Sequence, residues 1–355
     1  MGAECRACGL RKKRVLNDDI VRAIVNRDGN GSHHSLLYMG AVRANHSRLR
    51  VHANHLSMDT GMNGSKEMAQ RLLLTGASGF LGSACRAAWA DAYTIIPLCS
   101  RRTLSRPGLL PCDITDYGEV KAVLAEHRPD CVVHLAAIRD ANLCQKQPLA
   151  AARVNTQATG DLAGLCADRH LPFVFTSTDL VFDGREAPYS EADSVNPLSA
   201  YGEQKALAEE LVRARWPAAV IARLPLLFGP VGEGTENYAA SFLAALGAGQ
   251  PQRLFVDEFR TPLSGTDAAD GVRIALESGH AGLLHLGGAE RVSRYEFGQA
   301  ICRAAGVADS ALEPIHQVDL TMAAPRPQDV SLSSELAGAL GFEPRALAAA
   351  LQDLA

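Results

Sequence analysis

Short apolar runs alternate with longer segments of helical periodicity along most of the chain after residue 70. Continuous apolar runs of this length are typical of parallel strands buried on both faces, and the intervals between them leave room for crossover helices. Helices are expected from about Phe80 and over residues 115–127, 149–170 and 199–215. The expected strands cover residues 71–75, 93–98, 131–135, 172–177 and 218–224. The pattern predicts an α/β protein with a Rossmann-type doubly wound parallel sheet.

After Gly229 the alternation of apolar runs and helical segments becomes less regular. Helices are expected over 236–246, 267–277 and 294–305, with short strands such as 283–286 between them. We therefore expect a Rossmann domain over residues 68–228. Residues 229–355 are expected to form a smaller mixed region, with some segments returning to the Rossmann sheet.

The first 67 residues differ from the rest in texture and in charge. They lack sustained periodicity and are interrupted by Asn, Gly, Ser and His, so we expect a disordered extension over 1–67. Residues 1–66 hold 11 Lys and Arg against 5 Asp and Glu, whereas residues 67–355 hold 24 against 34. Cys5 and Cys8 have the spacing of half a zinc site, but no second pair completes it, so no metal is expected.

Composition excludes several classes of protein. A chain with 47% hydrophobic and 21% charged residues is an ordinary globular protein, and no stretch approaches the ~18 apolar residues that cross a bilayer. The mildly acidic body gives no reason to expect nucleic acid or a membrane as partner. The basic N-terminus lacks the apolar segment of a secretory signal, and the nine scattered cysteines fit a reducing compartment, so we expect a cytoplasmic protein.

A glycine-rich turn follows the first expected strand. Its sequence, TGASGFLG over 75–82, gives three glycines at the start of a helix, in the order that a dinucleotide-binding turn requires. The first glycine permits a tight turn, the second lets backbone N–H groups approach a pyrophosphate, and the third lets the helix pack close to the sheet. The expected contacts with the cofactor are Gly76, Ser78, Gly79, Phe80, Leu81 and Gly82.

The end of the second expected strand bears on the choice of cofactor. Arg101 and Arg102 stand where an NAD-selective site usually carries an acidic residue for the ribose 2′-hydroxyl. Two arginines would instead pair with a 2′-phosphate, which favours NADPH while leaving NADH open. Asp113 and Ile114 follow a short expected strand and are candidates for the adenine pocket.

Tyr201 and Lys205 lie four residues apart on one face of an expected helix. A tyrosine acts as a general acid near neutral pH only if its pKa falls well below ~10, and a neighbouring ammonium favours the phenolate. Upstream, the hydroxyls of residues 176–178 lie at the carboxyl end of an expected strand, where open α/β sheets bind ligands. A hydroxyl there can hold a carbonyl oxygen.

These motifs together resemble those of an extended short-chain dehydrogenase/reductase, and within that superfamily those of the dTDP-4-dehydrorhamnose reductase family. The resemblance covers Arg71 to the C-terminus. Its most specific blocks are FTSTDLVFDG (175–184) and APYSEADSVNPLSAYGEQK (187–205), and weaker ones are CDITD (112–116), DCVVHLAA (130–137), RLPLLFGP (223–230), SRYEFGQAI (293–301) and RPQDVSL (326–332).

The resemblance implies a role for each matching residue. Tyr201 would protonate the C4 keto oxygen of a nucleotide-linked sugar while NADPH delivers a hydride to C4. Lys205 would hold the nicotinamide ribose, and Thr178 would hydrogen-bond the substrate oxygen. The region after 229 would be mainly substrate-binding, and a homodimer stays open. Residues implied along the cofactor are His134, Leu135, Ala136 and Ala137, with Arg223 near the nicotinamide.

Two departures from the family pattern fall on the substrate side. Residues 224–227 read LPLL, where the rhamnose reductases often carry a tryptophan, and Asp329 and Val330 stand where Asn and Ser usually follow the late RP motif. Two alternatives to a sugar reductase therefore stay open. One is a nucleotide-sugar epimerase or dehydratase, and the other is a non-catalytic NADP-binding regulatory subunit like the methionine adenosyltransferase β subunit.

Overall fold

The structure, a computed structural model, describes residues 69–100, 107–230 and 235–354. The expected extension over 1–67 and the pair Arg101 and Arg102 lie outside these residues. Residues 69–355 form one compact unit.

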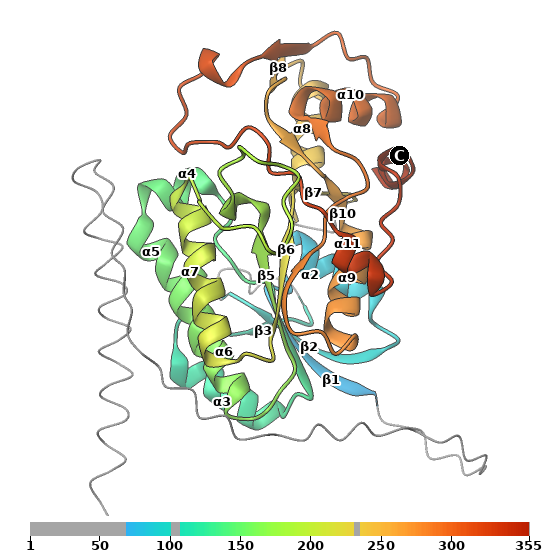
Figure 1. Cartoon of the computed structure of the whole chain (residues 1–355). Coiled ribbons are helices and arrows are strands. Elements are labelled where there is room, and N and C mark those ends of the chain that lie inside the picture. The colour runs from blue at the N-terminus through green and yellow to red at the C-terminus, as the bar shows by residue number, and fades with distance from the viewer. Residues whose placement is uncertain (1–68, 101–106, 231–234, 355) are drawn as a thin grey trace, which may run out of the picture. The chain divides into compact units, whose positions relative to one another are not determined.

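A seven-stranded parallel sheet forms the centre of this unit (Figure 1). The strands lie in the order β11-β6-β5-β4-β1-β2-β3, so the chain winds outward from β1 in one direction and then in the other. The predicted doubly wound parallel sheet is confirmed. Its strands are β1 (Gln70–Thr75), β2 (Tyr93–Cys99), β3 (Leu110–Pro111), β4 (Cys131–His134), β5 (Phe173–Thr178), β6 (Val220–Leu224) and β11 (Gly282–His285).

Each face of the sheet is covered by its own set of helices. Leu72, Leu74 and Val133 face α2 (Phe80–Ala88), α9 (Gly265–Glu277) and α11 (Glu335–Ala339) in one apolar cluster. Leu73 and Phe175 belong to a second cluster on the other face. Alternate residues of a strand point to opposite faces, so the continuous apolar runs fill both clusters. The helices over the second cluster are α3 (Tyr117–His127), α6 (Thr159–Ala167) and α7 (Ala200–Arg215).

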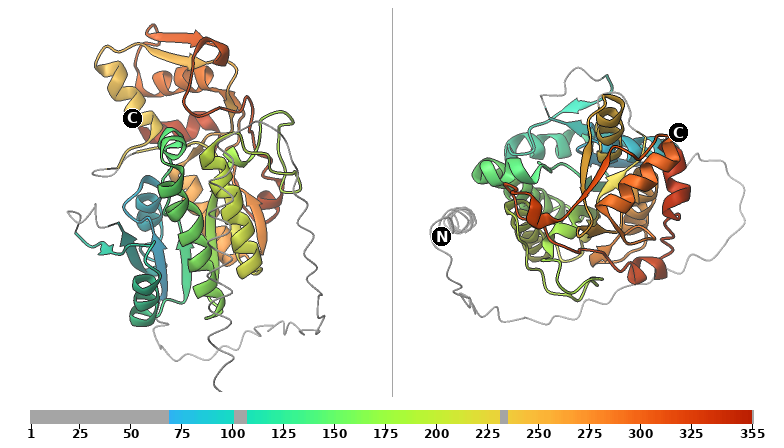
Figure 2. Two further views of the ribbon diagram at one scale, coloured as in Figure 1. Left: turned by 90° about the vertical axis from the view of Figure 1, so that its left-hand side faces the viewer. Right: turned by 90° about the horizontal axis from the view of Figure 1, so that it is seen from above.

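A smaller lobe stands over the carboxyl end of the sheet (Figures 1 and 2). Its own core contains Phe228, Phe242, Phe297 and Ile301. The lobe comes mostly from residues after 229. From the same part of the sequence, β11 joins the Rossmann sheet as its edge strand, and α9 and α11 pack on that sheet. Its elements are α8 (Tyr238–Gly247), α10 (Arg294–Ala305), α12 (Leu347–Ala350) and the short strands β7 (Leu227–Phe228), β8 (Gln252–Phe255), β9 (Phe259–Arg260), β10 (Leu263–Ser264), β12 (Val292–Ser293) and β13 (Leu312–Ile315).

The helix expected over 149–170 contains a π-helical turn in the structure. It consists of α5 (Pro148–Ala152), a π-helical turn (Arg153–Ala158) and α6, preceded by the short α4 (Ala141–Lys146). Within the turn, the amide of Asn155 donates to the Ile138 carbonyl oxygen and to Gln204 Oε1, both at 2.9 Å. Such a turn is often found at functional sites, and here it ties the loop after β4 to α7.

Candidate active site

The glycine turn connects β1 directly to α2. Gly76 has φ +69°, and a Cβ on it would lie 2.8 Å from the Ala136 nitrogen. A Cβ on Gly82 would overlap the Gly76 oxygen. Gly79 is the N-cap of α2 and brings no side-chain oxygen to the first amides of the helix. Glycines at these positions before a helix N-terminus leave room for the pyrophosphate of a dinucleotide, so these residues fit that group.

The loop after β4 lies against this turn. The Ala136 amide donates to the Thr75 hydroxyl at 3.2 Å, and the Leu135 amide donates to the Thr75 carbonyl oxygen at 3.3 Å. Leu135, Ala136 and Ala137 are all half-buried. Two segments that the sequence expected to contact one cofactor are therefore side by side. Of the remaining turn residues, Ser78 and Leu81 are half-buried, and the Phe80 ring fills the space beside Gly229 and Gly265.

His134 belongs to the core rather than to this surface. Its ring is fully buried between the rings of Phe173 and Phe175. Its Nδ1 lies 2.7 Å from the Thr75 hydroxyl, and its Nε2 lies 3.0 Å from the Thr159 hydroxyl. Burial, and secondarily the charge of Lys205, lower the pKa of His134 to about 3. The ring is therefore neutral and holds β1, β4 and α6 together.

Lys205 is buried one turn after Tyr201 on α7. Its Nζ donates to the carbonyl oxygen of Thr176 at 2.7 Å and lies 4.1 Å from the centre of the Phe175 ring. Burial lowers the pKa of Lys205 to about 7, against the opposing charge of Glu209. The amine thus lies at the carboxyl end of β5.

Thr178 ends β5 beside Tyr201. Its hydroxyl accepts from the Leu180 amide at 3.2 Å and donates to Asp179 Oδ1 at 3.1 Å. Burial raises the pKa of Tyr201 above its ordinary value, and the charge of Asp179 acts in the same direction. A hydrogen bond with Thr178 acts the other way. The expectation that Lys205 keeps Tyr201 acidic is therefore not met in the chain by itself, because burial outweighs the favourable neighbours.

The residues expected around the adenine lie at the edge of the sheet. Asp113 is exposed after β3, and its Oδ1 accepts from the amide and the hydroxyl of Thr115 at 2.9 and 2.7 Å. Ile114 is half-buried. Arg101 and Arg102, on which the preference for NADPH depends, lie outside the described residues.

Sequence reasoning missed two buried ion pairs near Lys205 and Thr178, one of them with Glu209 and the other with Asp179. Arg223 binds Glu209 through two hydrogen bonds of 3.0 and 2.7 Å, so its guanidinium is held by α7. Arg260, from β9 of the lobe, reaches Asp179 Oδ2 at 2.9 Å. The only available signal was Asp179 inside the STD motif, because nothing local marks an arginine 81 residues further along as its partner.

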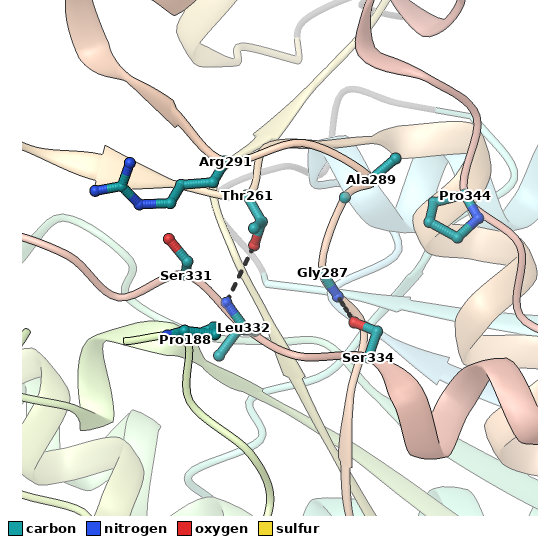
Figure 3. Close-up of a pocket in the computed structure, with 10 residues that line it drawn as sticks. Pro188, Thr261, Gly287, Ala289, Arg291, Ser331, Leu332, Ser334 and Pro344 are labelled. Atoms are coloured by element: carbon teal, nitrogen blue, oxygen red, sulfur yellow. Dashed lines mark hydrogen bonds between the residues drawn. The ribbon is translucent and has the colours of Figure 1, made fainter. Parts of the chain in front are cut away.

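A cavity of about 380 Å³ lies among segments of the lobe and the end of β11 (Figure 3). Thr261, Gly287, Arg291, Ser331 and Ser334 are among its lining residues. Hydrogen bonds join Thr261 to Leu332 and Gly287 to Ser334 along its wall. Thr178, Tyr201 and Lys205 are not part of this wall, so the cavity is separate from the catalytic side chains.

Neither a metal centre nor a membrane span is found in the part of the chain that the structure describes. No cluster of three His, Cys, Asp or Glu side chains there could hold a metal ion. No helix among the same residues has the length and apolar character to cross a bilayer. Cys5 and Cys8 lie outside the described residues.

Comparisons with known proteins place this chain in a family. The chain is 34% identical over 278 residues to a probable low-salt glycan biosynthesis reductase, Agl14, of Haloferax volcanii, covering 76% of this chain and 91% of that protein. It is 31% identical to methionine adenosyltransferase 2 subunit beta of Danio rerio, covering 77% of this chain and 85% of that one.

A solved structure shares the fold. It is dTDP-4-dehydrorhamnose reductase of Bacillus anthracis in complex with NADP, with a TM-score of 0.73 and 23% identity, covering 80% of this chain and 98% of that one. The predicted Rossmann-type fold and oxidoreductase class are confirmed. The family model described as the RmlD substrate binding domain matches residues 70–355, and this chain belongs to that family, which is the family of the dTDP-4-dehydrorhamnose reductases.

Proposed function

We propose that this chain reduces the C4 keto group of a nucleotide-linked sugar with NADPH. The observation that carries the proposal is the meeting of Tyr201, Lys205 and Thr178 at the carboxyl end of β5, two strands from the glycine turn. The carboxyl edge of an open parallel sheet is where ligands bind in such folds. The first candidate substrate is dTDP-4-dehydro-L-rhamnose, by analogy with the family.

The chain binds a nicotinamide cofactor, and residues of two loops and of α7 would contact it. The glycine turn over 76–82 would hold the pyrophosphate, and residues 135–137 would lie along the cofactor. Lys205 would hold the nicotinamide ribose, and Arg101 and Arg102 would pair with the 2′-phosphate that distinguishes NADPH from NADH. Bound NADPH supplies the hydride that C4 of the sugar receives.

Tyr201 supplies the proton in this proposal. Its hydroxyl donates to the keto oxygen as the C4–H bond forms, so the carbonyl becomes an alcohol and the tyrosine is left as a phenolate. The Thr178 hydroxyl, which donates to Asp179 in the chain by itself, would turn its proton to the same oxygen and position it. An ionised Lys205 stabilises the phenolate, and solvent returns the proton.

A reducing cytoplasm suits this chemistry. Seven cysteines within the described residues are buried and form no disulfide, and burial raises the pKa of Cys131 and Cys166 to about 12. Thiols kept protonated in this way are inert. We therefore place the enzyme in the cytoplasm, with a nucleotide sugar as its partner.

The test is NADPH oxidation by the full chain with dTDP-, GDP- and UDP-linked 4-keto sugars. We expect stoichiometric oxidation with one of them, whereas an epimerase or dehydratase would retain and recycle its cofactor. Tyr201→Phe should lower kcat by about 10²- to 10⁴-fold. Tyr117→Phe, at a half-exposed tyrosine of α3, is the matched control and should leave kcat unchanged. Equal turnover of the two variants would reject the mechanism.

A second function is supported by the similarity to the methionine adenosyltransferase β subunit. In that case the chain would bind NADP and regulate a larger enzyme without turning over a sugar. Binding of the purified chain to a methionine adenosyltransferase catalytic subunit, together with no NADPH oxidation on any keto sugar, would favour it. Stoichiometric NADPH oxidation would argue against it.

A further inference from the structure

A chain of buried charges connects the lobe to the end of β5. Arg260 Nη1 lies 2.9 Å from Asp179 Oδ2, and Arg260 Nη2 lies 3.3 Å from Glu258 Oε1. The side chains of Arg260, Asp179 and Glu258 are 7%, 3% and 3% exposed. Removing one partner of such a buried group leaves an uncompensated charge, which is strongly unfavourable. The three side chains therefore hold one another in place.

The chain continues into α10. The Arg294 amide donates to the Glu258 carbonyl oxygen at 2.9 Å, and its Nε lies 3.9 Å from Glu258 Oε1. The Arg294 guanidinium also lies 3.8 Å from the centre of the Tyr238 ring of α8. Glu258 is thus held by Arg294 of α10, which itself packs on Tyr238 of α8, and it holds Arg260 in turn.

Asp179, held in this way, fixes the orientation of the Thr178 hydroxyl. Thr178 Oγ1 donates its single proton to Asp179 Oδ1 at 3.1 Å, and its lone pairs then face other donors, of which the Leu180 amide is one. Arg260 occupies the other carboxylate oxygen. The direction of the Thr178 O–H bond, and the charge beside Tyr201, therefore depend on how Asp179 is held.

We propose that Arg260 is a positioning residue for the reductase reaction: by holding the Asp179 carboxylate, it sets the direction of the Thr178 hydroxyl and the electrostatic environment of Tyr201. The inference deepens the proposed function and rests on it for its kinetic consequence. Arg260 does not touch the reacting atoms in this proposal and acts only through Asp179 and Thr178.

The proposal predicts opposite effects of two substitutions on the ionisation of Tyr201. Asp179→Asn removes a negative charge beside the phenol, so the phenol should ionise at lower pH. Arg260→Met removes the cation that offsets Asp179 and Glu258, so the phenol should ionise at higher pH. Arg139 and Cys144 also act on the ionisation of Tyr201, and both are unchanged in the two variants. Lys205, one turn along α7, is unchanged as well.

The pH dependence of kcat should shift in the same directions as the ionisation of Tyr201. A reductase needs a protonated Tyr201, so activity is lost as pH rises through the pKa of the phenol. The alkaline limb of the kcat profile should therefore move to lower pH in Asp179→Asn and to higher pH in Arg260→Met. At neutral pH we expect Arg260→Met to lower kcat by about thirtyfold with little change in the KM for NADPH, and Arg260→Lys to recover about a third of that loss on a logarithmic scale.

A control separates positioning from mere stability. Arg215 of α7 binds Asp161 at 2.8 Å and lies fourteen residues after Tyr201 in sequence, so Arg215→Met removes an ion pair of the same helix away from the site. It should lower Tm while leaving the kcat profile in place. If Arg260→Met behaves like Arg215→Met, with a lower Tm and an unmoved alkaline limb, Arg260 is a structural residue and the proposal is overturned.

A readout without substrate keeps this test independent of the proposed function. The tyrosinate absorbance of each variant is titrated with NADP+ bound, and the titration of the same variant carrying Tyr201→Phe is subtracted, which isolates the phenol. Opposite shifts in Asp179→Asn and Arg260→Met support the proposal even if no keto sugar is reduced. Turnover of a keto sugar with an unshifted phenol in both variants rejects it and leaves the reductase function standing.

Discussion

The carboxyl edge of the central sheet has two sides that differ in the groups that form them. Backbone atoms and glycines form the side at β1 and β4, where Gly76 lies against Ala136 and α2 starts without a capping side chain. Buried ion pairs between distant segments form the side at β5 and β6, where Asp179 meets Arg260 and Glu209 meets Arg223. In our proposal the first side holds the cofactor, whereas the second side depends on individual ion pairs that can be removed one at a time.

Loss of an ion pair on the second side should have the largest effect on stability. Arg223→Met leaves Glu209 buried without its cation, and such a loss typically costs about 3–5 kcal/mol of unfolding free energy. Arg71→Met, which removes an exposed pair with Asp130, should cost about 0–1 kcal/mol. Urea unfolding of both variants measures the difference. Equal costs would show that burial does not distinguish these two ion pairs.

A methyl group added to the glycine turn on the first side should instead lower the affinity for the cofactor. Gly82→Ala would place a Cβ against the Gly76 oxygen, so the turn must open, and we expect NADPH affinity to fall about hundredfold, or ~2.7 kcal/mol. Gly338→Ala in α11, where a Cβ meets open space, is the control. Calorimetric titration with NADPH gives both affinities, and unchanged binding in Gly82→Ala would remove the glycine turn from the cofactor site.

The choice between cofactors should give a smaller effect. If Arg101 and Arg102 bind the 2′-phosphate, NADPH should bind about tenfold more tightly than NADH, which is ~1.4 kcal/mol. NADPH should then raise Tm more than NADH at equal concentration. The double substitution Arg101→Ala, Arg102→Ala should make the two shifts equal. A native protein that is stabilised equally by both cofactors would contradict the assignment.

The last effect is the smallest for a change of one pH unit and concerns an exception on the first side, where His134 is a buried polar group. Its folded pKa of about 3 lies below the ordinary value of 6.5, so the unfolded chain binds more protons between these values. Stability should therefore fall as pH drops below 6.5, by roughly 1 kcal/mol per pH unit. His134→Asn should show a shallower decline in Tm between pH 6.5 and 4. A parallel decline would mean that other groups, such as His285, dominate.

The same contrast explains which features could be predicted from the sequence. Continuous apolar strands and the glycine turn are local patterns, and they predicted the sheet and the residues at 76–82. The pairing of Tyr201 with Lys205 follows from helical spacing. The partner of Asp179 could not be predicted, because a buried carboxylate accepts any cation that the fold brings to it. The π-helical turn at Asn155 also depends on distant partners, Ile138 and Gln204.

The position of β11 has a consequence for anyone dividing this protein into fragments. β11 pairs with β6, and α9 and α11 cover the same face as α2, yet all three follow the lobe's first elements in the chain. A fragment that stops at Phe228 would lack an edge strand and would expose Leu74, Ala222 and Leu224 to water. Separating a minimal nucleotide-binding unit therefore requires excision of the lobe and rejoining of the chain, rather than one cut.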